Sequence, residues 1–329
     1  MPFEFRDKSI TTVEKILRPD SHFRLQSSRC LARIQNALMG RPDTVLFFGA
    51  GLGDDLLCST VAHELKKRGS GRIVMFSQTP SLFRNNPDVS AVFKMGYPTI
   101  GRLRRWGFNV CIPQYATYDQ ETDRDITPNQ PALITMCRMA GMSGPVELRP
   151  YLYLLKRERG CGRLTGNQIV IQSAGLAIMK NKEWLPGRYQ EVADTIKSRG
   201  KIIQLGLASD PAISGALDLR GKTSVRQSAA ILANSKVFIG QAGFLMHLAR
   251  AVDCRSVIVF GGREDPRVFG YAANENLIGI TDCSPCWQRT KCDYDHQCMR
   301  QIEVAQVVEA VERQLDRTVT SLPLEVTEI

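Results

Sequence analysis

The chain has 329 residues, enough for two domains of ordinary size, and 43% of them are hydrophobic, enough to form real cores. Its formal charge of +10 suits an acidic partner such as an anionic glycolipid, a nucleotide or a nucleic acid, although an excess of this size also serves solubility alone. No run of about 18 apolar residues occurs, which excludes a membrane-spanning helix.

The N-terminal ten residues lack the apolar centre of a signal peptide. We therefore expect a cytoplasmic protein whose ten cysteines are thiols or metal ligands rather than disulfides. Residues 1–40 form an extension ahead of the first predicted strand. Within it, residues 27–39 have helical spacing and end at Gly40 and Pro42. A helix that packs on the domain is favoured there over one that binds a partner.

The stretch around which the chain is organised is residues 44–69. A buried strand is predicted at 44–48, a glycine-rich turn at 49–53 and an amphipathic helix at 56–67, with Asp54 and Asp55 between turn and helix. A dinucleotide fingerprint is one interpretation, but the spacing differs from G-x-G-x-x-G and two acids would repel a pyrophosphate. Asp54 could instead cap the helix. The third interpretation is a general base at the mouth of a sheet.

Three further strands are predicted in the first half, at 72–76, 89–93 and 110–113. A polar, proline-punctuated loop of the kind that carries binding function is predicted at 114–130, and a helix at 133–140. These elements give a domain over residues 41–158. The charged, glycine-rich segment 156–166 is predicted as the linker.

The second half repeats the alternation over residues 165–315, and residues 316–329 are a tail. Strands are predicted at 169–172, 201–205, 236–239 and 256–260, and helices at 189–198, 225–233 and 245–252. Strands that alternate with helices indicate parallel sheets. The fold class is therefore α/β, with two Rossmann-like domains that face each other across a cleft at the carboxyl ends of their strands.

Three segments follow predicted strands of the second half. Residues 180–189 hold Lys180, Lys182 and Arg188 beside a helix start, which makes an anion site or a plain solvated loop. Residues 239–250 lead through two glycines into a helix that carries His247, and a helix-borne histidine is more often structural than catalytic. Residues 260–267 hold Gly261 and Gly262, which allow a close backbone approach or form a simple turn.

A cysteine cluster lies near the C-terminus, with four cysteines in sixteen residues: Cys283, Cys286, Cys292 and Cys298. In a reducing compartment this pattern indicates a tetrathiolate site for a structural zinc or iron ion. The spacing differs from the usual pair of C-x2-C motifs, so free thiols are the alternative, and His296 is a substitute ligand. The other cysteines are predicted to be small buried hydrophobes.

Together these residues resemble glycosyltransferase family 9, the heptosyltransferase-like enzymes of GT-B fold, over about residues 43–312. The resemblance rests on five features: Leu52-Gly53-Asp54 before a helix, Asn86-Pro87, Lys182-Glu183-Trp184-Leu185-Pro186, Leu245-Met246-His247-Leu248-Ala249, and Phe260-Gly261. The C-terminal cysteines recur in a branch of that family. It is the order and spacing of these motifs together that are specific.

The resemblance implies inverting, metal-independent transfer of a sugar from a nucleotide-sugar, with the acceptor on the N-terminal domain and the donor on the C-terminal domain. The family's general base falls on Asp54, where Asp55 is the second choice, and its diphosphate-binding lysine falls on Lys182. The other donor-binding positions fall on Ser173, Ala174, Gly175, Gln241, Gly243 and His247. No catalytic metal is implied, and any metal on the cysteines would be structural.

At one position the chain departs from the family pattern. Many members carry an acid five residues before the histidine, where this chain has Ala242 beside Gln241. The sugar, the nucleotide and the acceptor therefore stay open, and the acceptor could be a lipid-linked glycan, a protein side chain or a small metabolite, including an anionic one. The rival hypothesis is a non-catalytic nucleotide or nucleic-acid binding protein that keeps the fold. Nucleic acid is disfavoured, because the chain lacks a dense basic stripe with interleaved aromatics.

Overall fold

The computed structural model describes residues 33–48, 51–96, 98–174, 177–317 and 326–327. The chain divides into two units, residues 1–42 and 43–329. Of the helix predicted at 27–39, residues 33–39 are helical and residues 27–32 lie outside the described part of the chain. Among the described residues, no helix is long and apolar enough to cross a membrane.

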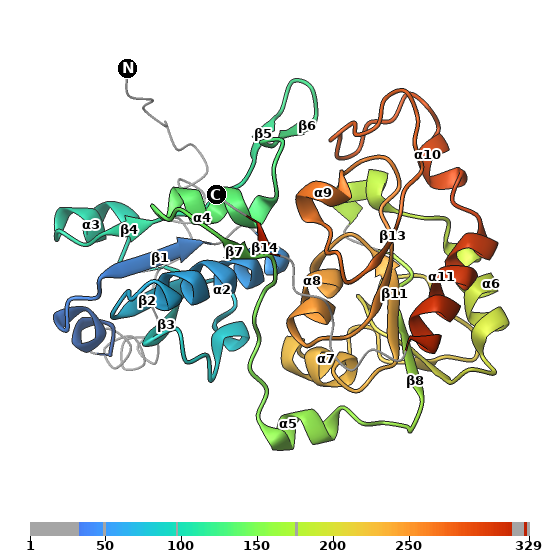
Figure 1. Cartoon of the computed structure of the whole chain (residues 1–329), viewed down its shortest axis with the longest axis horizontal. Helices are drawn as coiled ribbons and strands as arrows, with labels where there is room; N and C mark the ends of the chain where they lie inside the picture. The colour runs from blue at the N-terminus through green and yellow to red at the C-terminus, as the bar shows by residue number, and fades with distance from the viewer. Residues whose placement is uncertain (1–32, 49–50, 97, 175–176, 318–325, 328–329) are drawn as a thin grey trace, which may run out of the picture. The chain divides into compact units, whose positions relative to one another are not determined.

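The first sheet of the larger unit has four parallel strands in the order β3-β2-β1-β4 (Figure 1). They are β1 (Thr44–Phe48), β2 (Ile73–Ser77), β3 (Ala91–Lys94) and β4 (Val110–Cys111). Every residue of β1 and β2 is buried. Near-continuous hydrophobic runs of this kind are what a parallel sheet covered on both faces requires.

The second sheet has six parallel strands in the order β10-β9-β8-β11-β12-β13, which is the doubly wound order 3-2-1-4-5-6. They are β8 (Gln168–Ile171), β9 (Lys201–Gln204), β10 (Leu217–Asp218), β11 (Val237–Gln241), β12 (Ser256–Val259) and β13 (Glu275–Leu277). The predicted α/β class with two parallel sheets is therefore confirmed.

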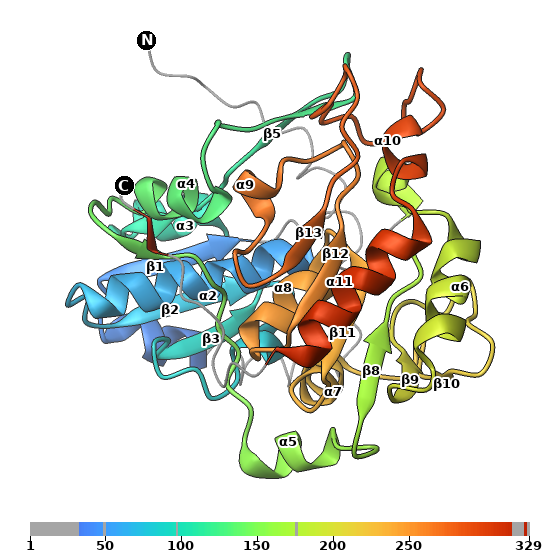
Figure 2. The same ribbon diagram turned by 45° about the vertical axis from the view of Figure 1, so that its right-hand side comes forward.

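The helices alternate with these strands. In the first half they are α2 (Leu52–Lys67), η2 (Pro80–Phe83), α3 (Ile100–Arg105), α4 (Ala132–Met139) and α5 (Lys156–Cys161). In the second half they are η3 (Ala177–Lys182), α6 (Pro186–Ile196), α7 (Val225–Leu232), α8 (Phe244–Ala251), α9 (Pro266–Phe269), α10 (Gln297–Arg300) and α11 (Val304–Asp316). Figure 2 shows α6 and α11 side by side, as their contacts require.

The segment predicted as a loop is partly regular, and the segment predicted as a linker contains a short helix. The predicted loop 114–130 contains an antiparallel hairpin, β5 (Thr117–Asp119) and β6 (Arg124–Ile126). The predicted linker 156–166 contains α5, because the Glu158 carboxylate accepts from the Leu155 N–H at 2.9 Å and caps a short helix.

Near the C-terminus, β14 (Val326–Thr327) pairs antiparallel with β7 (Val146–Glu147).

Alternate faces of the second sheet bury two different cores. Along β8, Val170 belongs to one hydrophobic cluster and its neighbours Ile169 and Ile171 to another, since side chains alternate across a strand. The second cluster lies under α6 and α11. The first continues into the N-terminal sheet, joining Leu57 of α2 to residues of α8 such as Leu248. An apolar core thus spans both sheets of the larger unit.

Candidate functional site

The cleft of the larger unit lies where the strand order of each sheet reverses. In the first sheet, β2 lies on one side of β1 and β4 lies on the other side, so the strand order reverses at β1. In the second sheet, β9 and β11 lie on the two sides of β8 in the same way. Loops that follow strands at a switch point diverge and leave a crevice at the carboxyl ends. Here the crevice is lined by the segments after β1, β4, β8 and β11.

The cleft has a volume of about 560 Å³, within the range of sites for small molecules and cofactors. Its N-terminal wall includes Gly51, Leu52, Gly53, Asp54, Gln114, Tyr115, Thr117, Tyr118, Asp125 and Thr127. Its C-terminal wall includes Gln172, Met179, Lys182, Leu207, Thr223, Ser228, Gln241, Gly243, Phe244, His247, Glu264, Phe269 and Arg289. Both the predicted base and most of the predicted donor residues therefore face one space.

Asp54 lies in the first turn of α2 and does not cap it, since the N-cap is Gly51. The capping interpretation was therefore wrong. The Asp54 carboxylate instead accepts a hydrogen bond from the Tyr115 hydroxyl, which comes from the loop after β4. Burial raises the pKa of Asp54, while the Tyr115 bond and the charge of Lys182 oppose that rise. A carboxylate with a raised pKa is well suited to accept a proton near neutral pH.

Asp55 points the other way, into the first domain. Its side chain is fully buried and accepts from the Ser77 hydroxyl at 2.7 Å and from the Thr79 N–H at 3.0 Å. These bonds tie the start of α2 to the end of β2. Asp55 is therefore a structural residue, in agreement with its second rank as a base.

A series of ion pairs with alternating charge lies at the cleft. Lys182 lies 2.7 Å from Glu264 Oε1, and Arg263 pairs with both Glu264 and Asp125. Arg289 also pairs with Asp125, at 2.6 Å. Burial acts to raise the pKa of Glu264, but the charges of Lys182 and Arg263 outweigh it and hold that pKa below its usual value. Lys182 is therefore held in place by a buried carboxylate at the cleft.

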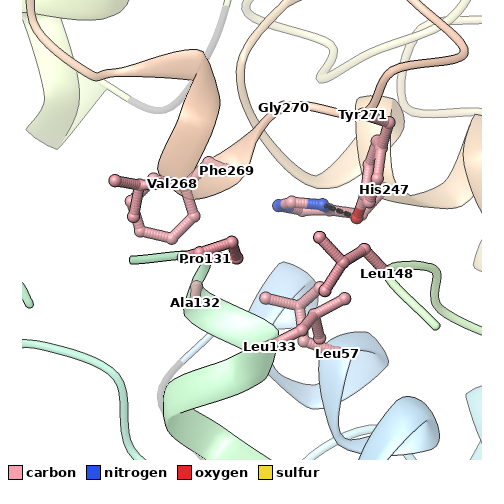
Figure 3. A pocket seen from close by; sticks show the side chains of 10 residues that line it. All are labelled: Leu57, Pro131, Ala132, Leu133, Leu148, His247, Val268, Phe269, Gly270 and Tyr271. Atoms are coloured by element: carbon pink, nitrogen blue, oxygen red, sulfur yellow. Dashed lines mark hydrogen bonds between the residues drawn. The ribbon is translucent and has the colours of Figure 1, made fainter. Parts of the chain in front are cut away.

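His247 lies one turn into α8 and is 7% exposed. Its Nδ1 is 2.6 Å from the Tyr271 hydroxyl, and burial, with the charge of Lys182, lowers its pKa to about 3. His247 also lines a small cavity of about 10 Å³. In Figure 3 its ring points across this space toward Phe269 and Pro131. At neutral pH this histidine is therefore an uncharged hydrogen-bonding group.

Two helix N-termini converge on the cleft. The helices α2 and α8 contact each other, and their N-caps, Gly51 and Gly243, make no side-chain capping bond. A side chain at Gly53 would lie 3.3 Å from the His247 ring, so glycine permits the close approach of the two helices. The positive ends of both helix dipoles favour an anion here.

Of the three predicted donor residues that follow β8, Ser173 and Ala174 do not line the cleft. Ser173 is buried; its hydroxyl donates to the Pro211 carbonyl at 2.6 Å and accepts from Gln204 at 2.9 Å, and it is not among the cleft-lining residues. Its neighbour Gln172 does line the cleft. Gly175 lies outside the described residues. Gln241 ends β11 and lines the cleft.

The four clustered cysteines are not gathered into a metal-ligand group. Among the described residues, no set of three or more His, Cys, Asp or Glu side chains is placed to hold an ion. Cys283 Sγ lies 3.3 Å from the Thr281 hydroxyl, and Cys292 Sγ accepts from the His296 N–H. Burial raises the pKa of both Cys286 and Cys298. Four thiols suit zinc or iron chemically, but this geometry does not form the predicted site.

Three residues of the site were missed from the sequence: Tyr115, Glu264 and Arg289. Tyr115 lies in the segment predicted as a binding loop, and it could have been found had the adjacency of β1 and β4 been recognised. Glu264 lies in the turn singled out after β12. Arg289 lies in the cysteine cluster, where the spacing of the thiols drew the interpretation toward a metal.

Comparison with known proteins gives a family match for the C-terminal half. Residues 164–296 match the model of Glycosyltransferase family 9 (heptosyltransferase). This confirms the resemblance drawn from the sequence motifs. No curated protein sequence matches the chain.

Solved structures match nearly the whole length of the chain. ADP-heptose LPS heptosyltransferase II of E. coli is 16% identical, with a TM-score of 0.62, and the match covers 83% of this chain and 98% of that one. The iron-containing dodecameric glycosyltransferase TibC of enterotoxigenic E. coli H10407 is 18% identical, with a TM-score of 0.65, over 85% of this chain and 77% of that one. TibC in complex with ADP-D-β-D-heptose is 16% identical, with a TM-score of 0.65, over 83% and 76%. At these identities the likeness establishes the GT-B fold.

Proposed function

We propose that this chain, a glycosyltransferase of GT-B fold whose residues 164–296 carry the family 9 domain, transfers a sugar from a nucleoside diphosphate sugar to an acceptor hydroxyl with inversion. One observation carries the proposal. A carboxylate with a raised pKa, Asp54, and a cation, Lys182, line opposite walls of one cleft, and two helix N-termini meet between them. Such a site provides a base on one side and an anion-binding surface on the other.

In the proposed reaction, the acceptor oxygen attacks the anomeric carbon from the face opposite the leaving diphosphate. A new carbon–oxygen bond forms as the bond to the diphosphate breaks, and the hydroxyl proton passes to Asp54. Lys182, the N-terminus of α8 and the segment that follows β8 would neutralise the charge that develops on the diphosphate, so that no metal is required. His247, Gln241 and Gly243 would hold the donor.

The donor class is supported by the family match and by the solved complex of TibC with ADP-D-β-D-heptose. We propose ADP-heptose or a related nucleotide-sugar as the donor. The acceptor would approach the N-terminal wall, where the segment from Gln114 to Tyr118 lies. The acceptor is a glycan, a protein or a small metabolite, and the excess of basic residues suits an anionic one.

The proposal is tested by replacing Asp54 with asparagine, which keeps the shape of the side chain and removes the base. With ADP-heptose as donor and a bacterial extract as the source of acceptor, release of ADP by Asp54→Asn should fall by about 10²- to 10⁴-fold. Binding of ADP should change little, since the diphosphate contacts lie on the other wall. Full ADP release by the variant would overturn the assignment of the base.

The alternative is a non-catalytic nucleotide binding protein, and Ala242 favours it because it stands where many family members carry an acid. The wild-type protein distinguishes the two functions. Binding of a nucleoside diphosphate without any sugar transfer would support the alternative. Sugar transfer that depends on Asp54 would exclude it.

We also propose a cytoplasmic location, and a structural zinc or iron ion on Cys283, Cys286, Cys292 and Cys298. The support is the supply of four thiols within sixteen residues and the similarity to TibC, which contains iron. The thiols would have to move together to bind it, and no step of the transfer depends on the ion. Elemental analysis of purified protein should find about one equivalent, and less than about a tenth of an equivalent would reject the site.

A further inference from the structure

The hydroxyl of Tyr115 is the only side-chain hydrogen-bond donor to Asp54 among the described residues. Tyr115 lies in the loop after β4, some sixty residues from Asp54 in sequence, and the strand order brings the two together at the switch point of the first sheet. The other carboxylate oxygen, Oδ2, faces Gly51, where an added Cβ would lie only 3.1 Å away. The carboxyl group therefore lies between the Tyr115 hydroxyl and the Gly51 backbone.

The ring of Tyr115 is held by the other domain. Its edge packs against Phe269 of α9, with centroids 5.1 Å apart and planes at 76°. Phe269 packs in turn against Trp287, which lies beside Cys286. A residue that bonds to a carboxylate on one wall and packs on the opposite wall keeps its position only while the two walls stay together.

We propose that Tyr115 is the positioning residue for Asp54, which fixes the orientation of the carboxylate toward the acceptor hydroxyl, and that the packing of Phe269 on Tyr115 makes this orientation depend on both walls of the cleft. The inference deepens the proposed function and rests on it. Burial, and next the charge of Asp54, raise the pKa of Tyr115 well above its usual value. The tyrosine therefore stays a hydrogen-bond donor around neutral pH and does not compete with Asp54 as a base.

Several charged or titratable groups lie close to Asp54. They are Asp55 and Cys58 on its own helix, Tyr115 after β4, Lys182 in η3 and Glu264 after β12, while His247 of α8 faces the neighbouring Gly53. Of these, the Tyr115 bond is the strongest influence that lowers the pKa of Asp54. Its loss should therefore raise that pKa and move the acid limb of the rate profile to higher pH.

The test is Tyr115→Phe, which keeps the ring on Phe269 and removes only the hydroxyl. With ADP-heptose as donor, kcat should fall on the order of tenfold, because a misoriented base is costly. The KM for the donor should stay unchanged, and the acid limb of kcat should move to higher pH. Phe269→Ala removes the ring that packs against Tyr115, and this variant should also have a lower kcat. An unchanged kcat and an unchanged acid limb in Tyr115→Phe would overturn the proposal.

A matched control is Tyr153→Phe. It removes another tyrosine-to-aspartate hydrogen bond of the same domain, from Tyr153 to Asp88 at 3.3 Å, and Tyr153 does not line the cleft. It should leave kcat and the acid limb as they are in the wild-type protein. A shift of the acid limb in this control equal to that of Tyr115→Phe would show that the effect is not specific to Asp54.

A second readout separates this inference from the proposed function. The titration of Asp54 is followed by carbon NMR in protein labelled at the aspartate carboxyls, with the resonance assigned by its loss in Asp54→Asn. Asp54 should titrate at higher pH in Tyr115→Phe than in wild-type protein, whether or not sugar is transferred. If wild-type protein transfers no sugar but the titration shifts, the proposed function fails and the Tyr115 bond stands. If the titration does not shift, the inference fails.

Discussion

At the scale of single residues, the cleft depends on side chains whose pKa values are shifted by burial. Desolvation disfavours the charge of Asp54 and raises its pKa, and for the same reason His247 is a neutral group. The opposing charges of Lys182 and Glu264 act on both of them. The result is one carboxyl group with a raised pKa and one paired cation on facing walls, with an uncharged histidine that lines the same cleft.

The buried His247 predicts a pH dependence of stability. Its pKa of about 3 in the folded protein lies below its ordinary value near 6.5, so the unfolded chain binds a proton that the folded one does not. The contribution of the neutral His247 to the free energy of unfolding is complete above about pH 6.5 and is lost as pH falls toward about 3. In that window, protonation of this residue in the unfolded chain should lower the free energy of unfolding by up to about 1.4 kcal/mol per pH unit.

Chemical denaturation at a series of pH values checks this prediction. His247→Gln keeps a group that can hydrogen-bond to Tyr271 but cannot gain the proton. The variant should therefore show a shallower loss of stability between pH 6 and 4 than wild-type protein does. Equal slopes for the two proteins would contradict the burial argument.

At the scale of elements, the β5–β6 hairpin holds the two walls together. It belongs to the N-terminal half, yet Asp123 accepts hydrogen bonds from the Thr290 and Lys291 backbones at 2.8 and 2.9 Å, and the Asp125 N–H donates to the Trp287 carbonyl at 3.0 Å. Figure 1 shows the hairpin beside the segment that leads to α10. The cysteine-rich segment thus completes the cleft from the side of the second domain.

Loss of the Asp123 carboxylate should release this hairpin. Burial acts to raise its pKa, but hydrogen bonds from the Lys291 and Thr290 amides and from the Tyr118 hydroxyl hold the pKa well below its usual range. Asp123→Ala removes these acceptors and should lower stability by roughly 2 kcal/mol. Hydrogen exchange should rise in residues 114–127 and 287–291.

The matched control is Asp119→Ala. Asp119 lies in the same hairpin, but within the described part of the chain its carboxylate bonds to Glu121 and Thr122, which are hairpin residues. Exchange in residues 287–291 should stay at the wild-type level in this control. If Asp123→Ala leaves hydrogen exchange in residues 287–291 unchanged, the hairpin does not hold the two walls together.

The long periodic elements could be predicted from sequence, and the short ones could not. The strand Thr44–Phe48 was predicted with its exact bounds, because a run of buried β-formers before a glycine turn leaves few alternatives. The β5–β6 hairpin was missed because its strands are mostly exposed and polar, so no alternation marks them. Helix α11 was overlooked, although Val307, Ala310, Val311 and Gln314 share its buried face at helical spacing.

The candidate site followed the same rule. Asp54, Lys182 and His247 lie in segments that follow predicted strands, so the topology brings these segments to the cleft. Tyr115 and Arg289 depend on which strands are neighbours and on how the hairpin folds back, and a sequence pattern carries neither. Ser173 illustrates the converse: it follows a strand, but its hydroxyl bonds inward to Pro211.

At the scale of the whole larger unit, the two sheets are joined on both sides of the cleft. Besides the hairpin, Arg226 of α7 is 6% exposed and donates to the carbonyls of Tyr153 and Ser81 and to the Glu158 carboxylate. An apolar core also runs from α2 into α8. A large apolar interface restricts the domain motion that two-domain chains usually show. The cleft is therefore largely formed before any ligand arrives.

The claim that the cleft is a nucleotide-sugar site is tested most directly by a thermal-shift panel of nucleoside diphosphates and their sugars. A ligand that binds the folded protein raises Tm by mass action. We predict that one nucleoside diphosphate, with ADP the first candidate, raises Tm, and that Lys182→Ala abolishes the rise. If no nucleotide or nucleotide-sugar raises the Tm of the wild-type protein, the cleft is not a donor site and the account is contradicted.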